Sequence, residues 1–171
     1  MLPKKTEKMA DLMKGITLLN KELEEVKAEE ALAGKVVALY FSAGWCPPCK
    51  QFTPKLHRLY NALRSNGKPF EVVFFTRDRS RADFEENFTE KHGDWLSVKF
   101  DDPILTRYPP KFEVKSIPVC RIINSAGKIV EMDGKTIITE HGKEKALELF
   151  AKWEEACKKS LPKNKNVQFS E

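Results

Sequence analysis

One apolar run, followed at once by a helical pattern, constrains the fold of this chain more than any other feature. Residues 36–41 (VVALYF) are all apolar and rich in β-branched and aromatic side chains. A strand of this kind needs cover on both faces, which helices provide in α/β sheets. After a short gap, apolar side chains recur at the spacing of one helix face. They are Phe52, Leu56, Leu59, Tyr60 and Leu63. The two patterns predict a central strand and a helix packed on one face of its sheet.

The next part of the chain repeats this alternation. Residues 70–75 (FEVVFF) have the composition of a second buried strand. Ser80 followed by Asp83 resembles a capping box, in which the serine side chain accepts a hydrogen bond from the first turn of a helix. Phe84 and Phe88, four residues apart, then supply the buried stripe of that helix. The predicted order up to this point is strand, helix, strand, helix.

The second half predicts a simpler ending. Residues 101–112 contain three prolines, which favours a loop with at most a short helix. Residues 117–124 and 129–132 are strand-like and flank the turn sequence SAGK, so they predict an antiparallel hairpin. An apolar stripe at helical spacing over 146–157 predicts a last helix. We therefore expect an α/β sheet that ends in a hairpin and one helix.

The segment before Lys35 allows two structures. Residues 21–32 are rich in Glu and Ala, which favours a helix by propensity alone. Residues 16–19, followed by the polar Asn-Lys-Glu at 20–22, suit a small hairpin equally well. The sequence leaves both structures open.

Size and composition indicate one compact domain. The 171 residues include 11 Phe and 3 Trp, which is enough apolar surface for a core. No apolar run approaches the roughly 20 residues that cross a bilayer, and the N-terminus lacks a secretory signal pattern. We therefore predict a cytoplasmic or nuclear protein without a membrane partner. The predicted division is an N-terminal extension at 1–15, a domain at 16–157 and a disordered basic tail at 158–171.

The charge balance argues against a nucleic-acid partner. The net charge is +5. Residues 158–171 hold four Lys and one Glu, so most of the excess lies in the tail. A nucleic-acid binder gathers Lys and Arg on a folded face, with aromatic residues among them. We therefore predict no binding to nucleic acid.

Two of the four cysteines form a pair at the junction of the central strand and the first helix. Cys46 and Cys49 are separated by two prolines, whereas Cys120 and Cys157 stand alone. A thiol at a helix N-terminus feels the positive end of the helix dipole, which can lower its pKa from about 8.5 to ~3.5–7.5. Cys46 is then the attacking thiolate. Cys49, one turn later, is placed to attack the resulting mixed disulfide and is the predicted resolving thiol.

The prolines between the cysteines change how the thiolate is stabilised. Pro47 and Pro48 have no N–H to donate, so fewer backbone donors face Cys46. Stabilisation should depend more on the N–H and S–H groups of Cys49 and on nearby positive charge. The candidate cations are Lys50, Arg77, Arg79 and Arg81. The prolines also pre-set the backbone of the first helical turn, which favours a rigid site.

Other uses of the cysteine pair lack support in the sequence. A zinc site needs two further ligands at usable spacing, and no second CxxC or HxxxH is present. His57 lies eleven positions after Cys46 with no hydrolase signature around it, so we expect a surface histidine. His92 and His141 lie beside glycines in predicted loops and receive no role. We predict neither a metal nor a bound cofactor.

Three segments resemble a known family. YFSAGWCPPCKQFTPKLHRLY, FEVVFFTRDRSRADFEENF and SIPVCRI resemble the tryparedoxin and nucleoredoxin branch of the thioredoxin superfamily. The similarity covers roughly 16–153, and WCPPC followed by FTP is specific to that branch. The resemblance implies a thioredoxin fold, which is a three-layer α/β/α arrangement around a central mixed sheet, here with an N-terminal extension. It also implies dithiol–disulfide exchange, with Cys46 as nucleophile and Cys49 as resolving cysteine.

The same resemblance implies residues that receive the substrate. Trp45 would be a wall beside the cysteines, and Pro118 occupies the family's cis-proline position. Ile117 could then hydrogen-bond an extended substrate segment by strand addition. Trp95 could line the substrate surface or pack the core. The arginine run at 77–81 suits a solvated loop, but loops after strands gather near the active edge, where this one could attract acidic substrates.

The chain also departs from the family pattern. Six residues before the nucleophile, many thioredoxins have a buried Asp that handles the proton of the resolving thiol, whereas this chain has Tyr40. Asp78, at the end of the second strand, is the remaining candidate for the proton acceptor. Val119 stands where the family often has Thr, and Cys120 follows it. By strand alternation we expect Cys120 to be buried and inert rather than a second redox thiol.

These observations predict an oxidoreductase that reduces disulfides in protein partners. Cys46 attacks, Cys49 resolves, and an upstream dithiol reductant or reductase restores the pair. Two alternatives belong to other classes of function. One is a redox-responsive binding module with little turnover. The other is a thiol peroxidase that acts directly on peroxide.

Overall fold

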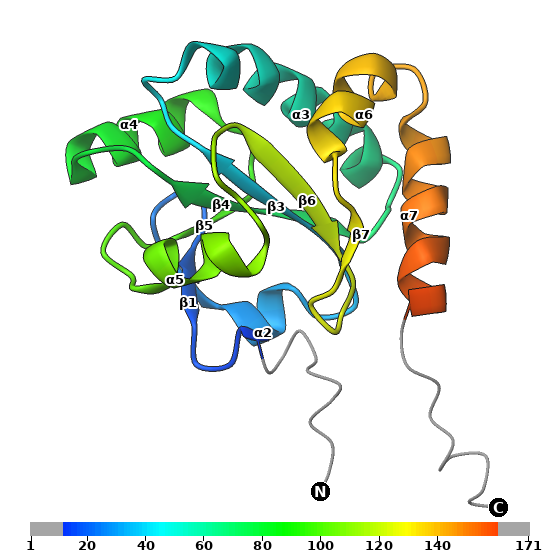
Figure 1. The fold of residues 1–171 in the computed structure, drawn as a ribbon, viewed down its shortest axis with the longest axis horizontal. Helices are drawn as coiled ribbons and strands as arrows, with labels where there is room; N and C mark the ends of the chain where they lie inside the picture. The colour runs from blue at the N-terminus through cyan, green and yellow to red at the C-terminus, as the bar shows by residue number, and fades with distance from the viewer. Residues whose placement is uncertain (1–11, 161–171) are drawn as a thin grey trace, which may run out of the picture.

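The predicted central strand is β3 (Val36–Ser42), and all seven of its residues are buried. The computed structural model describes residues 12–160 (Figure 1). In it, β3 pairs in parallel with β4 (Phe70–Thr76) and antiparallel with β6 (Val119–Ile123). Because β3 has a neighbour on each side and helices over both faces, its continuous apolar sequence is accounted for.

The sheet within residues 12–160 has seven strands in the order β2-β1-β5-β4-β3-β6-β7. The remaining strands are β1 (Thr17–Leu19), β2 (Glu25–Lys27), β5 (Leu96–Val98) and β7 (Ile129–Glu131). Strand β4 is parallel to both β3 and β5, and the other neighbouring pairs are antiparallel. The sheet is therefore mixed, as predicted.

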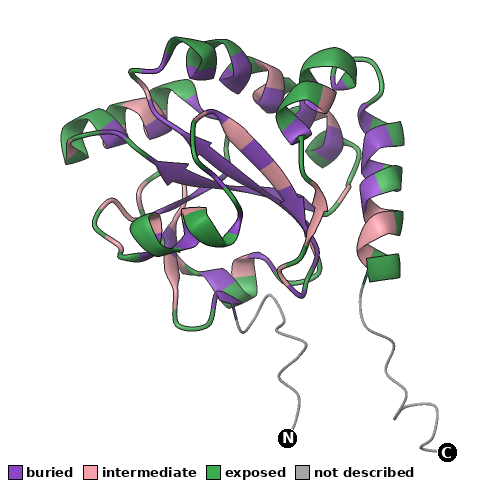
Figure 2. Ribbon diagram, viewed as in Figure 1, coloured by how far each residue is buried: buried purple, intermediate pink, exposed green. Residues whose placement is uncertain are grey.

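Alternate residues of the central strands point into two separate cores. On β3, Ala38 and Tyr40 enter one core, and Leu39 and Phe41 enter the other. The first core is closed by α3 (Pro47–Ser65), α4 (Arg81–Lys91), α6 (Gly134–His141) and α7 (Ala146–Ser160). The second is closed by α2 (Ala28–Ala31) and α5 (Ile104–Lys111). Figures 1 and 2 show the buried sheet between these two helical layers. This is the three-layer thioredoxin fold.

The open question at the N-terminus is settled in favour of a hairpin. Strands β1 and β2 pair antiparallel, and the Asn20 side chain organises their turn. Its Oδ1 atom accepts hydrogen bonds from the N–H groups of Glu22 at 3.0 Å and Glu24 at 2.9 Å. Helical structure in the Glu- and Ala-rich stretch is confined to α2. Local hydrogen bonding by Asn20 therefore outweighs helix propensity here.

The C-terminal part contains one helix more than predicted. Two helices, α6 and α7, follow the hairpin, and the expectation of a single helix was wrong. The α6 sequence is rich in β-branched residues, which have low helix propensity. One local feature and one tertiary contact favour it nonetheless. The Asp133 side chain caps its N-terminus by accepting from Thr136 N–H at 3.3 Å, and Gly134 lets the helix approach β6, because a Cβ there would lie 2.8 Å from the Cys120 carbonyl oxygen.

Both ends of the described part differ in detail from the predicted boundaries. Leu12 and Met13, placed in the predicted extension, are buried in the second core. The last helix continues to Ser160, into the segment predicted as a tail. Residues 1–11 and 161–171 lie outside the described residues. No helix of the described part is long and apolar enough to cross a membrane.

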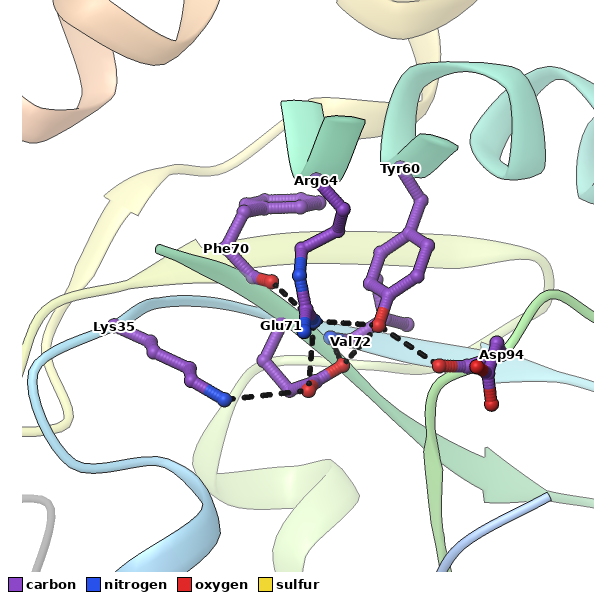
Figure 3. Close-up of polar contacts among 7 residues, drawn as sticks. All are labelled: Lys35, Tyr60, Arg64, Phe70, Glu71, Val72 and Asp94. Atoms are coloured by element: carbon purple, nitrogen blue, oxygen red, sulfur yellow. Dashed lines mark hydrogen bonds and ion pairs between the residues drawn. The ribbon is translucent and has the colours of Figure 1, made fainter. Parts of the chain in front are cut away.

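A cluster around one buried carboxylate lies where β4 begins, and we call it the Glu71 cluster: Lys35, Tyr60, Arg64 and Glu71 (Figure 3). Glu71 is only 5% exposed. One of its oxygens lies 3.2 Å from Arg64 Nη1 and 3.6 Å from Lys35 Nζ. The other accepts from the Tyr60 hydroxyl at 3.0 Å and from Val72 N–H at 3.1 Å. Both oxygens of this buried carboxylate thus have hydrogen-bond or ion-pair partners.

Candidate active site

The cysteine pair lies in the short connection between β3 and α3, as predicted. Cys46 is the N-cap residue of α3, and Cys49 lies in its first turn. The two are joined by a disulfide, with their Cα atoms 5.2 Å apart. Cys46 is 4% exposed and Cys49 1%, and both pack against Ala43 and the partly buried Ile117. The sheet and the helix together fix the position of both sulfur atoms.

The two prolines after Cys46 leave few backbone N–H groups to donate hydrogen bonds to its sulfur. Pro47 and Pro48 occupy the first two helical positions, where an N–H would otherwise be free. The Cys49 N–H points at Cys46 Sγ, at 3.4 Å. Backbone stabilisation of charge on Cys46 therefore falls to this N–H and to the helix dipole behind it.

The Ile117–Pro118 segment faces the cysteines from β6. The bond between the two residues is cis, which the sequence could not show by itself. The Ile117 carbonyl oxygen lies 4.0 Å from Cys46 Sγ, and the Ile117 side chain is half-buried against the disulfide. Pro118, far apart from Cys46 in the sequence, is thus brought to the same edge of the sheet.

The Trp45 side chain is exposed beside the cysteines and is held in place by the loop after β4. Its side chain is 43% exposed, which makes it one of three large exposed hydrophobic residues in the described part. The indole Nε1–H donates to the Arg77 carbonyl oxygen at 3.1 Å. The Arg79 guanidinium lies 4.3 Å from the ring centroid, in cation–π contact. The loop after β4 is therefore part of the active edge.

Asp78, the candidate proton acceptor, is 8% exposed. Its oxygens accept from Gly44 N–H at 2.7 Å, from the Thr76 hydroxyl at 2.7 Å and from Asn87 Nδ2 at 3.3 Å. These bonds hold the turn that presents Trp45. A Cβ on Gly44 would lie 3.3 Å from Asp78 Oδ1, so the absence of a side chain there allows the close approach.

Tyr40 connects the centre of the sheet to Cys49 through Thr53. It is fully buried, and its hydroxyl lies 2.6 Å from Thr53 Oγ1. Thr53 Oγ1 in turn donates to the Cys49 carbonyl oxygen at 3.0 Å, so Tyr40 is the donor to Thr53. Burial raises the pKa of Tyr40 to about 12, which keeps the hydroxyl protonated. Sequence reasoning missed Thr53, although its spacing of four from Cys49 on a helix was a usable signal.

The two remaining cysteines are free and lie away from the disulfide pair. Cys120 is opposite Tyr40 in the β3–β6 register and is 1% exposed. Burial raises the pKa of Cys120 to about 12 and, with the nearby Glu154 carboxylate, that of Cys157 to about 11. Thiols with such pKa values remain protonated and unreactive near neutral pH. The expectation of a buried Cys120 is confirmed.

An aromatic cluster beneath α3 includes two residues whose roles the sequence did not decide. Trp95 is 1% exposed and therefore belongs to the core, not to the substrate surface. Its Nε1–H donates to His92 Nδ1 at 3.1 Å. His92 is 2% exposed and lies 4.2 Å from the Phe74 ring centroid. Burial, with Lys21 and His57 nearby, lowers the pKa of His92 to about 3, so this histidine is neutral.

His57 is half-buried rather than fully at the surface. It meets the Trp95 ring edge-on, with the ring centroids 5.9 Å apart. Its distance in sequence from the cysteines and its packing on the core leave it no chemical role here. Among residues 12–160, no three His, Cys, Asp or Glu side chains gather in a way that could hold a metal ion.

A hollow of about 230 Å³ adjoins Trp45 on the α4 side. Its lining consists of Gly44, Trp45, Asp78, Asp83, Glu86, Asn87 and Lys91. The hollow therefore carries three carboxylates and one ammonium group next to the exposed indole.

Comparisons with known proteins agree with this geometry. Residues 34–129 match a family model described as thioredoxin-like. Among curated relatives, probable nucleoredoxin 1 of Arabidopsis thaliana is 33% identical over 147 residues, which is 82% of this chain and 25% of that protein. Nucleoredoxin of Danio rerio is 32% identical over 130 residues, which is 75% of this chain and 30% of that protein. The chain thus spans about a quarter to a third of the length of these relatives.

Solved structures of similar size match over most of their length. A thioredoxin from Wuchereria bancrofti has a TM-score of 0.71 and 35% identity, and the match covers 82% of this chain and 96% of that one. A tryparedoxin from Trypanosoma brucei has a TM-score of 0.70 and 34% identity, with 80% and 94% covered. The fold is therefore shared with these structures over nearly their whole length.

Proposed function

The chain belongs to the thioredoxin-like family, in its tryparedoxin- and nucleoredoxin-like branch, and from this premise we propose that it reduces disulfides in protein partners. The observation that supports the proposal best is the Cys46–Cys49 pair at the N-terminus of α3. Cys46 caps the helix beside Trp45, whereas Cys49 lies one turn deeper. This arrangement supports Cys46 as the attacking sulfur and Cys49 as the resolving one.

The exchange consists of two thiolate attacks. In the reduced protein, the Cys46 thiolate attacks one sulfur of the substrate disulfide, forms a mixed disulfide and expels the other substrate sulfur as a thiolate, which takes up a proton. The Cys49 thiol loses its proton, attacks Cys46 Sγ and releases the second substrate thiol. Two electrons pass to the substrate, and the Cys46–Cys49 disulfide remains. A dithiol reductant or reductase then returns the pair to the reduced form.

Nearby groups have separate tasks in this scheme. Trp45 and the Ile117–Pro118 segment flank the attacking sulfur and receive the substrate chain, with the Ile117 carbonyl oxygen available to an extended partner backbone. Pro47 and Pro48 keep the first turn rigid. The exchange needs no bound cofactor, because sulfur carries the electrons. A dithiol that must be kept reduced suits a cytoplasmic or nuclear protein.

Dithiothreitol-driven reduction of insulin tests the proposal. We expect activity in the wild type, none in Cys46→Ser, and mixed disulfides that accumulate on Cys49→Ser because the resolving step is lost. Cys120→Ser is the matched control, since it removes a buried, protonated thiol and should leave the rate unchanged. If wild type and both site variants give the uncatalysed rate, the proposal fails and a redox-responsive binding module becomes the better reading.

A further inference from the structure

Four exposed cations lie on the segments that build the site, and we call them the basic rim: Lys50, Arg77, Arg79 and Lys115. Each is placed by an element that builds the site. Lys50 is in the first turn of α3, and its N–H bonds to the Cys46 carbonyl oxygen. Arg77 and Arg79 lie in the loop that holds Trp45, and Lys115 is two residues before Ile117. The rim therefore lies on three segments that border the cysteine pair.

No member of the basic rim forms an ion pair within residues 12–160. Several cations elsewhere do. Arg81, only two residues from Arg79, pairs with Asp101, and both Lys35 and Arg64 pair with Glu71. The four rim cations therefore have no internal ion-pair partner, and all of them lie on segments that build the site. Arg79 is also held over the Trp45 ring, so less conformational entropy is lost when it meets a partner.

The nearby carboxylates do not neutralise the rim. Asp78 is buried and accepts three hydrogen bonds from neutral groups. Asp83 and Glu86 lie in the hollow beside Trp45, where Lys91 also lies. These two carboxylates lie on the α4 side of Trp45, and neither forms an ion pair with a member of the rim.

From the unpaired rim we infer that the preferred protein partners carry acidic side chains next to the disulfide that is reduced. The inference rests on the proposed function and adds the class of substrate. Exposed charges that have no internal partner can gain Coulomb energy from a docked chain, and they also steer its approach. Because all the rim side chains are exposed, the effect should weaken as salt screens them.

Three peptides that differ only in charge provide the test. Each contains the same disulfide, flanked on both sides by Glu, Gln or Lys. The measured quantity is the second-order rate constant for their reaction with the pre-reduced protein at low salt. We expect the Glu peptide to react about fivefold faster than the Gln peptide and the Lys peptide to react more slowly than either. The three rates should converge at about 0.5 M salt.

Charge reversal at the rim identifies the groups responsible. In the double variant Arg77→Glu and Arg79→Glu, the order of the Glu and Lys peptides should reverse. Lys115→Glu is a second variant that leaves the Arg79–Trp45 contact intact, and it should lower the preference for Glu about twofold. Lys152→Glu is the matched control, because Lys152 is exposed on α7 beside Trp153, which stacks on Phe70 at the start of β4. The Lys152→Glu variant should leave the rate constants of all three peptides unchanged.

The outcomes separate this inference from the proposed function. Equal rates for all three peptides at low salt, or a faster Lys peptide, would overturn the inference while catalysed reduction of the Gln peptide still supported the reductase. Reversal by Lys152→Glu would also overturn it, because the effect would then come from net charge alone. If the Gln peptide is not reduced at all, the proposed function fails and the inference fails with it.

Discussion

Charged side chains are paired with one another at the start of β4 and unpaired just after its end. At its start, Glu71 is buried and surrounded by Lys35, Arg64 and Tyr60, with every oxygen bonded (Figure 3). At its other end, next to Trp45, the Arg77 and Arg79 side chains are exposed and have no carboxylate partner among the described residues. One end uses its charges to hold secondary-structure elements together. The other leaves them for contact with another molecule.

The comparison shows what a structural and a functional use of charge look like in one small domain. A buried carboxylate must be satisfied internally, because leaving it without partners would cost several kcal/mol. An exposed cation is solvated and can stay unpaired at little cost. The exposed cations beside the cysteine pair are therefore free to contact a partner, whereas the charges of the Glu71 cluster are already used within the domain.

Glu71→Ala should have the largest effect on stability. It would leave Arg64 and Lys35 without their shared carboxylate and remove an acceptor from the buried Tyr60 hydroxyl. Both cations are partly exposed and can be hydrated, so we expect a loss of about 3 kcal/mol, the lower end of the range for broken buried pairs. Urea denaturation measures it. Arg81→Ala, which breaks the exposed pair with Asp101, is the matched control and should cost under about 1 kcal/mol. Equal losses of stability in the two variants would contradict the contrast between the buried carboxylate and the exposed ion pair.

His92 extends the comparison to a buried group that has no charged partner. Its pKa is about 3 in the folded protein, and a free histidine has a pKa of about 6.5, so only the unfolded chain binds this proton between these values. Stability should therefore fall as the pH drops through this window. From pH 7 to pH 5 the loss attributable to His92 is about 2 kcal/mol.

His92→Asn tests this assignment. The Asn side chain keeps an acceptor for Trp95 Nε1–H but does not titrate. The pH dependence of the free energy of unfolding should be flatter in the variant between pH 7 and pH 5. Parallel curves for variant and wild type would show that His92 does not supply the acid sensitivity.

Tyr40→Phe should have an intermediate effect. The variant keeps the ring contacts with Phe52 and Phe74 but removes the donor to Thr53 Oγ1, which holds the Cys49 carbonyl. One buried hydrogen bond is worth about 1 kcal/mol. Denaturation of the oxidised and reduced forms would measure the loss in each state. A variant as stable as the wild type in both states would show that the Tyr40–Thr53 bond does not anchor this turn.

Arg79→Ala should have the smallest effect on stability. An exposed cation–π contact contributes about 0.5 kcal/mol, and the Trp45 Nε1–H bond to Arg77 remains. We expect nearly unchanged thermal unfolding but increased quenching of Trp45 fluorescence by a neutral quencher, because one face of the ring becomes accessible. A large loss of stability would mean that this end of β4 also depends on its charges, which would remove the contrast with the Glu71 cluster.

The parts of the site that could be predicted from the sequence are those formed by residues adjacent in the chain. The buried strand, the cysteine pair and the amphipathic helix are consecutive, so their order alone placed Cys46 at a helix N-terminus. Local signals also identified Ser80 as a cap, and its side chain does accept from Asp83 N–H. By contrast, α6 was missed because its residues are poor helix formers by themselves. Its cap at Asp133 and the approach of Gly134 to β6 decide the outcome.

The burial of particular aromatic and titratable groups was also beyond the sequence. Trp95 could equally have been a surface or a core residue, and His92 received no role. Their positions follow from the packing of α3 and α4 against the sheet, which brings Phe74, Trp95 and His92 together. The link from Tyr40 through Thr53 to Cys49 likewise needs the register of β3 beneath α3.

The sequence by itself determined the alternation of buried strands and amphipathic helices, and with it the family, the fold and the cysteine pair. These follow from periodicity and from chemistry carried by adjacent residues. Tertiary structure decided the partners of charges such as Lys35, Arg64 and Arg81, because each of these pairs joins residues from different parts of the fold. Whether Arg64, Arg79 or Arg81 finds a carboxylate depends on which elements the fold brings side by side, and no local pattern encodes that.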